Sequence, residues 1–171
     1  MPEQKEVDDE VESIIARFNL KPHPEGGFYT ETYRSQENFV VSNKNRSAST
    51  AIYFLLTSDS FSEMHRLCHD EIFHFYCGDQ VEMLQLYPDG SSAVVYLGNQ
   101  LLKGDSPQCI VPGNVWQGSR VAGGGRFALI GTTVSPGFDF ADFERGDRQV
   151  LSNRYPQCFQ MIESLTRGQA T

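Results

Sequence analysis

Long hydrophobic runs, an excess of positive charge and paired cysteines are all missing from this chain of 171 residues. Without a stretch of about 18 apolar residues it is not expected to enter a membrane, and without an apolar leader it is expected to be cytoplasmic. Its 14 Lys and Arg residues against 22 Asp and Glu residues give a net charge of -8, which excludes a basic surface for nucleic acid. The four cysteines form no CxxC pair, so reduced and mostly buried thiols are expected.

Short strand-like segments with turn residues between them fill the middle of the chain. Pro88-Asp89-Gly90 and Pro112-Gly113 are typical of such turns. Many short strands, spaced eight to twelve residues apart, indicate a β-sandwich or barrel. The expected strands cover residues 28–34, 51–56, 63–67, 71–77, 81–87, 91–97, 108–111, 115–121 and 127–134.

Helices are expected only near the two ends of the chain. Apolar residues at helical spacing from Val7 to Phe18 predict an amphipathic N-terminal helix, and a second helix is expected from about Pro156 to Thr166. Nothing divides the sequence, so one domain over residues 1–171 is predicted, with a core of about residues 11–167. The acidic N-terminal end and the last residues are expected to fray.

Strand alternation indicates which side chains could meet inside the barrel. Glu71 lies on one face of its strand and His74 on the other, because successive side chains of a strand point to opposite faces. His65 shares its face with Leu67. For the same reason only one of Trp116 and Gln117 can line the interior unless a bulge intervenes.

Several blocks of this sequence resemble the uncharacterised cupin family called domain of unknown function 985. The blocks are residues 23–29, 31–35, 49–56, 65–71 and 111–117. The resemblance implies a mostly β fold, the cupin double-stranded β-helix or jelly-roll barrel with an N-terminal and a C-terminal helix. It also implies a small-molecule cavity and a homodimer, since the outer sheet faces and edges of a cupin need cover.

The metal positions of cupins are only partly filled in this chain. In a metal cupin the first signature segment supplies two histidines and a glutamate, and the second supplies one more histidine. Here His65 and Glu71 stand at two of these positions, whereas Leu67 and Trp116 stand at the other two. No cofactor is therefore expected; if a divalent metal were bound, His65 and Glu71 would be its ligands.

The chain is also similar, more weakly, to metal-free cupins that epimerise nucleotide-linked sugars. That similarity implies that His65 acts as the base, and it leaves Tyr53 and Tyr33 open as the acid. Histidine suits this role because its ordinary pKa lies near neutrality. The further ligand-binding candidates are Glu31, Arg34, Glu71, His74, Trp116 and Gln117.

Most of these candidates also have a purely structural interpretation. Glu31 and Arg34 could form an outward-facing ion pair, His74 could pack among aromatic residues, and Trp116 could belong to the core. Three hypotheses of function follow. The chain is a metal-independent epimerase or isomerase of a carbohydrate or nucleotide-linked sugar, a ligand-binding cupin without turnover, or a metal-dependent oxygenase or isomerase.

Overall fold

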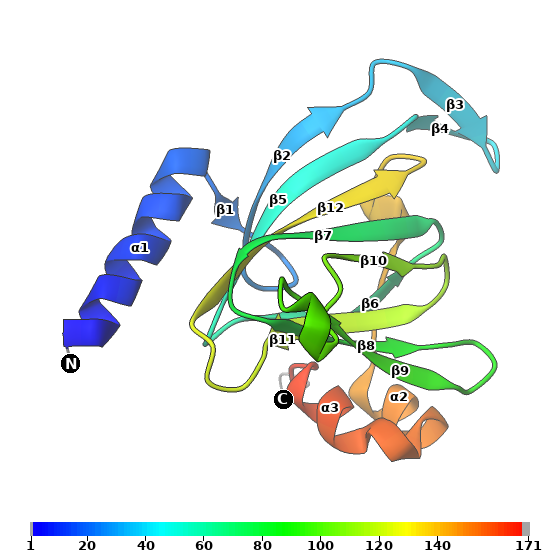
Figure 1. Ribbon diagram of the computed structural model, residues 1–171. Helices are drawn as coiled ribbons and strands as arrows, with labels where there is room; N and C mark the ends of the chain where they lie inside the picture. Colours follow the sequence, from blue (N-terminus) through cyan, green and yellow to red (C-terminus); the bar gives the residue numbers. More distant parts are fainter. Residues whose placement is uncertain (1, 169–171) are drawn as a thin grey trace.

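The computed structural model describes residues 2–168, without the side chains of residues 2–8, and consists of a barrel with helices at both ends of the chain (Figure 1). The helices are α1 (Pro2–Phe18), α2 (Arg148–Arg154) and α3 (Phe159–Ser164), with 3-10 turns η1 (Leu101–Lys103), η2 (Phe140–Asp142) and η3 (Pro156–Cys158). The strands are β1 (Lys21–Pro22), β2 (Phe28–Arg34), β3 (Asn38–Val41), β4 (Lys44–Ser47), β5 (Thr50–Thr57), β6 (Phe61–Leu67), β7 (Asp70–Gly78), β8 (Val81–Leu86), β9 (Ser92–Leu97), β10 (Gln108–Val111), β11 (Trp116–Val121), β12 (Phe127–Ser135) and β13 (Phe143–Arg145).

Two antiparallel sheets form the walls of the barrel. One has the strand order β1-β2-β5-β12-β7-β10, and the other has the order β13-β6-β11-β8-β9. The hairpin β3-β4 forms a separate two-stranded sheet that extends from the rim beyond β2 and β5 (Figure 1). The predicted mostly β jelly-roll fold is therefore confirmed, and each of the nine predicted strands is present within a few residues of its expected bounds.

Three apolar clusters hold this barrel and its helices together. The first fills one part of the interior, around Phe54, Met83 and Ile130. The second joins the outer face of β6, β8 and β11 to α2 and α3, which lie beneath β8 and β9 in Figure 1. The third joins the apolar stripe of α1 to the outer face of β5 and β12. Because apolar side chains fill only part of the interior, the remainder is available for polar groups.

Several elements were not predicted from the sequence. Strand β3 has only four residues, β4 is polar throughout, and β13 has only three residues, so none of them shows a clear strand pattern. Helix α2 is capped by Asp147, whose side chain accepts a hydrogen bond from the backbone N–H of Val150. The predicted C-terminal helix is present but shorter than expected: a 3-10 turn begins at Pro156, and α3 covers Phe159–Ser164.

The ends of the chain were expected to fray. Helix α1 extends to Pro2 in the structure, and the final positions, residues 169–171, lie outside the described residues. Among the described residues there is no helix of the length and apolar character needed to cross a membrane.

Candidate functional site

The interior of the barrel contains a cavity of about 510 Å³. A cavity of this size is within the range that holds a small organic molecule. It is bounded by strands β2, β5, β6, β7 and β12, by the loop before β2 and by the segment that leads into η2. The residues that line it are His23, Glu25, Tyr29, Glu31, Arg34, Thr50, Ile52, Phe54, Ser62, His65, Leu67, Glu71, Phe73, Thr132, Val134, Phe138, Asp139 and Phe140.

His65 lies on β6, is 4% exposed and makes hydrogen bonds through both ring nitrogens. Its Nδ1 lies 2.7 Å from the backbone oxygen of Glu63, and its Nε2 lies 3.3 Å from the side-chain nitrogen of Gln117. A carbonyl oxygen only accepts, so Nδ1 carries the proton and donates to Glu63, while Nε2 accepts from Gln117. Burial lowers the pKa of His65, which favours this neutral tautomer.

Glu25 approaches His65 from the loop that precedes β2. One carboxyl oxygen of Glu25, Oε2, lies 3.3 Å from Nδ1 of His65 and accepts a hydrogen bond of 3.2 Å from the hydroxyl of Ser62. The loop turns at Gly26, whose φ of +112° is suited to glycine, and a Cβ there would collide with the carbonyl oxygen of Phe61. The glycine therefore permits the close approach that brings Glu25 into the cavity.

Burial moves the pKa values of Glu25 and of the neighbouring His23 in opposite directions. It raises the pKa of Glu25 to about 8, with the nearby Glu63 adding to the rise, and it lowers the pKa of His23 to about 4, with His65 contributing. Since burial disfavours whichever form is charged, Glu25 retains its proton and His23 lacks one at neutral pH. The backbone N–H of Glu25 donates to Nδ1 of His23, which also requires that nitrogen to be unprotonated.

A second carboxyl group, Glu71 on β7, lies on the other side of His65. Gln117 bridges the two, because its side-chain nitrogen donates to Oε2 of Glu71 at 2.5 Å and to Nε2 of His65. Burial raises the pKa of Glu71; the charge of His65 and hydrogen bonds from Gln117 and Thr132 oppose the rise. Strand pairing produces this arrangement, since Gln117 lies directly opposite His65 in the β6-β11 ladder.

An ion pair and two phenylalanines lie near the more exposed part of the cavity. Arg34 makes two hydrogen bonds to Glu31, at 3.0 and 2.7 Å, and its guanidinium also lies 3.4 Å from the backbone oxygen of Phe138. Phe138 and Phe140 pack edge to face with ring centroids 5.0 Å apart. The carboxylate of Glu31 therefore already neutralises the guanidinium of Arg34.

The structure brings some of the predicted site residues together and leaves others outside. Four of them line the cavity: His65, Glu71, Glu31 and Arg34. Gln117 donates hydrogen bonds to His65 and to Glu71. Only one of Trp116 and Gln117 was expected to face inward, and it is Gln117, which hydrogen-bonds His65 and Glu71 while Trp116 packs with the C-terminal helices.

The remaining predicted site residues do not line the cavity. Trp116 packs on the outer face with Met64 and the C-terminal helices, so it does not stand at the lumen position at which a cupin histidine was expected. Tyr53 packs beneath α1 against Phe18. Tyr33 is 55% exposed, and His74 hydrogen-bonds Thr133 on the outer face. Neither tyrosine therefore lies in the cavity beside His65, where one of them was expected to act as the acid.

Several polar residues of the cavity were not predicted as site residues, among them Glu25, His23 and Ser62. Glu25 and His23 belong to a block whose Pro and Gly content indicated only a loop, and Ser62 precedes the predicted start of its strand. A sequence signal was available, because a glutamate directly before two glycines is placed where the backbone can approach another strand closely. Nothing in the sequence, however, specified that the neighbour would be His65.

The donor set in the lumen does not fit a divalent metal. Both nitrogens of His65 are already hydrogen-bonded, and the amide of Gln117 directs its N–H groups at the two atoms that a metal would use. Leu67, which lines the same cavity, has no ligand atom. We therefore derive no chemistry through a metal in the lumen.

A double-stranded β-helix with a polar cavity inside the barrel defines a cupin. The fold resembles that of oxalate decarboxylase from Bacillus subtilis, with a TM-score of 0.54 and 13% identity over 84% of this chain and 36% of that one. The family Cupin superfamily (DUF985) matches residues 12–146, and the chain belongs to this family.

The names of the more similar relatives state no activity. A hypothetical protein from Leishmania major is 35% identical, with a TM-score of 0.86, over 92% of this chain and 98% of that one. A protein from Shewanella oneidensis is 37% identical, with a TM-score of 0.84, over 92% and 97%. An uncharacterized protein from Saccharomyces cerevisiae is 31% identical over 82% of this chain and 78% of its own length.

Proposed function

We propose that this cupin is a metal-independent isomerase or epimerase that moves a proton on a carbohydrate bound in the barrel. The observation that carries the proposal is the contact of 3.3 Å between Oε2 of Glu25 and Nδ1 of His65 inside the cavity. A protonated carboxyl group and a neutral imidazole at one place are the acid and the base that such chemistry needs at neutral pH.

The proton transfers can be written with these two groups alone. Nε2 of His65 takes the proton from the carbon beside a carbonyl, and the electrons of that C–H bond form a double bond to the carbonyl carbon. The carbonyl π electrons move to the oxygen, which takes the proton of Glu25, giving an enediol. Return of a proton to either carbon, or to the opposite face, completes isomerisation or epimerisation. The negative charge of Glu71 stabilises the imidazolium that forms, since it raises the pKa of His65 and so opposes the lowering caused by burial.

The charges of the cavity favour an uncharged carbohydrate over a nucleotide-linked sugar. Four carboxyl groups line it, from Glu25, Glu31, Glu71 and Asp139, and Arg34 is the sole Lys or Arg among the described lining residues. A diphosphate would have to displace Glu31 from that arginine, and its negative charge would lie close to the carboxylates of the cavity. Hydroxyl groups instead find donors and acceptors on the walls, and the C–H faces of a sugar suit the aromatic side chains.

Solvent isotope exchange tests the proposal. The protein is incubated in D₂O with aldoses, ketoses and nucleotide-linked sugars, and deuterium beside the carbonyl is followed by NMR. Wild type and the control variant Tyr33→Phe, changed outside the cavity, should exchange one of the uncharged sugars, and His65→Gln and Glu25→Gln should slow exchange about 100-fold or more. A His65→Gln variant that exchanges at the wild-type rate would contradict the assignment.

Ligand binding without turnover is the second candidate. It is favoured by the bonding of His65, whose two ring nitrogens are already occupied by Glu63 and Gln117. In that case a sugar would bind, as measured by calorimetry, and no deuterium would enter it. Loss of the Gln117 bond to Nε2 on ligand binding, seen as a shift of the His65 ring resonances, would favour catalysis.

We also propose that the protein is a homodimer. The support is the outer face of the six-stranded sheet, where Tyr33, Tyr76 and Ile110 are each half or more exposed. Large side chains exposed on one sheet face are typical of surfaces that another chain covers. Sedimentation velocity should give twice the monomer mass, and Ile110→Asp should reduce it; a monomer at all concentrations would contradict this proposal.

A further inference from the structure

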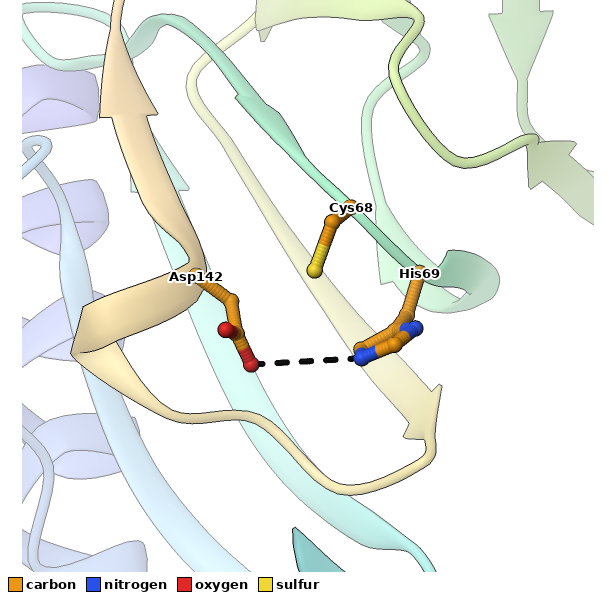
Figure 2. A group of neighbouring side chains, drawn as sticks. All are labelled: Cys68, His69 and Asp142. Carbon is orange, nitrogen blue, oxygen red and sulfur yellow. Dashed lines mark ion pairs between the residues drawn. The ribbon is translucent and has the colours of Figure 1, made fainter. Parts of the chain in front are cut away.

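A second group of chemically reactive side chains lies outside the residues that line the cavity. Cys68 and His69, in the turn between β6 and β7, face Asp142 at the end of η2, as Figure 2 shows. One ligand atom from each residue lies within 4.8 Å of the others. The antiparallel pairing of β13 with β6 brings them together. Phe143 lies opposite Leu67, so Asp142, which precedes Phe143, comes beside Cys68, which follows Leu67.

Asp142 is held in place by an arginine and retains ligand capacity. Arg46 donates from Nε to one carboxylate oxygen and from Nη2 to the other, both at 2.8 Å. This two-pronged contact with a guanidinium fixes the orientation of the carboxylate. A carboxylate offers about four lone-pair positions, of which the arginine takes two. Metal-binding carboxylates are typically oriented by such a partner.

The other two side chains present their ligand atoms to this carboxylate. The thiol of Cys68 lies beside Asp142, and a zinc ion would bind it as the thiolate, so its proton would be released on binding. Nε2 of His69 lies 3.9 Å from Oδ2 of Asp142, which is too long for a hydrogen bond. A cation between these atoms would use the sulfur, the imidazole nitrogen and a carboxylate oxygen.

We propose that Cys68, His69 and Asp142 form a zinc-binding site, with its fourth position open to water. Thiolate, imidazole and carboxylate together suit zinc, whereas magnesium and calcium prefer oxygen ligands alone. Zinc-to-ligand distances of about 2.0–2.3 Å place tetrahedral ligand atoms roughly 3.3–3.6 Å apart, so the side chains need to close by roughly 1 Å. His69 is free to do so, because it lies in a turn.

The neighbouring charges limit the affinity and provide a diagnostic variant. Lys44 lies 3.7 Å from Oδ1 of Asp142, and its side chain is half exposed. Together with Arg46 it repels a divalent cation, so the site binds zinc reversibly rather than as tightly as a four-cysteine site. Lys44→Gln removes one of these charges without touching a ligand, and it should therefore strengthen zinc binding.

A bound zinc ion would connect two parts of the chain that meet beside the cavity. The metal would join the β6-β7 turn to the segment that carries Phe138, Asp139 and Phe140, which line the cavity. Zinc would thereby stabilise the folded protein, because it binds the folded arrangement of these distant residues. This site is separate from the proposed chemistry of His65 and Glu25 and does not depend on it.

Cobalt titration of the metal-free, reduced full-length protein tests the site. One equivalent of Co²⁺ should produce a thiolate-to-cobalt charge-transfer band together with the strong visible bands of a tetrahedral ion, and Zn²⁺ should abolish both. Cys68→Ser should remove the charge-transfer band, and His69→Gln should weaken binding about tenfold or more. Cys77→Ser, which changes another exposed cysteine, should leave binding unchanged, and Lys44→Gln should strengthen it several-fold.

Three results would overturn the inference. The first is the absence of a charge-transfer band, and the second is unchanged metal binding in Cys68→Ser and His69→Gln. The third is loss of metal binding in His65→Gln while Cys68→Ser still binds, which would place the metal in the lumen. The folding of each variant is checked by its thermal transition without metal, so that a lost site is distinguished from a lost fold.

Discussion

Oε2 of Glu25 lies 3.3 Å from Nδ1 of His65, although the two residues belong to different elements and are 40 positions apart in the sequence. Burial raises the pKa of the glutamate and lowers that of the histidine, so the pair is neutral at pH 7 as a carboxylic acid beside an imidazole. A neutral pair avoids the desolvation cost of two buried ions and keeps both partners ready to transfer a proton.

Glu25→Gln should change how stability depends on pH. The carboxyl pKa rises from 4.5 to about 8 on folding, so the folded state retains a proton that the unfolded state loses. This stabilisation is fully present below pH 4.5 and is lost as pH rises to 8, a change of roughly 4 kcal/mol. Urea unfolding between pH 5 and pH 8 should show this fall in wild type and in the exposed control Glu163→Gln, and a smaller fall in Glu25→Gln. Parallel profiles for all three proteins would refute the assignment.

His23 should remain neutral well below the ordinary pKa of histidine. Its pKa is lowered from 6.5 to about 4, so it contributes stability that is present above pH 6.5 and is lost as pH falls towards 4. NMR of the imidazole C–H groups, assigned with His23→Gln, should show no titration of this ring near pH 6.5 and a midpoint near pH 4. A midpoint near 6.5 would mean that water reaches the ring.

Gln117→Leu should destabilise the protein by about 1–3 kcal/mol, because it leaves Glu71 and His65 buried without the donor that they share. Gln157 is exposed, so Gln157→Leu serves as the matched control and should change the free energy of unfolding by less than about 0.5 kcal/mol. Denaturant unfolding of both variants measures the difference. Equal effects would show that the bridge contributes nothing to stability.

Trp116→Phe should weaken the fold without affecting ligand binding. Trp116 is the only tryptophan of the chain; it packs in the cluster that holds α2 and α3 and lies beneath the guanidinium of Arg66, 4.5 Å from its ring centroid. The substitution should cost roughly 1–3 kcal/mol of stability in a thermal or denaturant transition. The affinity for any sugar found in the screen should stay within about twofold, and a larger loss would mean that the ring reaches the ligand.

Local sequence patterns were sufficient for nine of the thirteen strands that the structure describes and for the relative direction of many side chains. The alternation along β7 correctly placed Glu71 and His74 on opposite faces, and the same rule showed that Trp116 and Gln117 could not both face inward. It could not choose between them, because alternation fixes relative and not absolute direction. The choice depends on which face of β11 the C-terminal helices cover. Two elements on that side of the barrel, β13 and α2, are too short to show a clear periodic pattern, so they were not predicted.

The amino-acid sequence by itself determined the mostly β barrel, the turns and the common face of His65 and Leu67, because these depend on residues close together in the chain. Only the tertiary structure decided that Glu25 is the partner of His65, that both tyrosines lie outside the cavity, and that Asp142 meets Cys68 and His69. Those relationships arise from strand pairing and loop closure between distant segments, and the pKa values follow from the burial that this packing creates. Neither is encoded in any single segment.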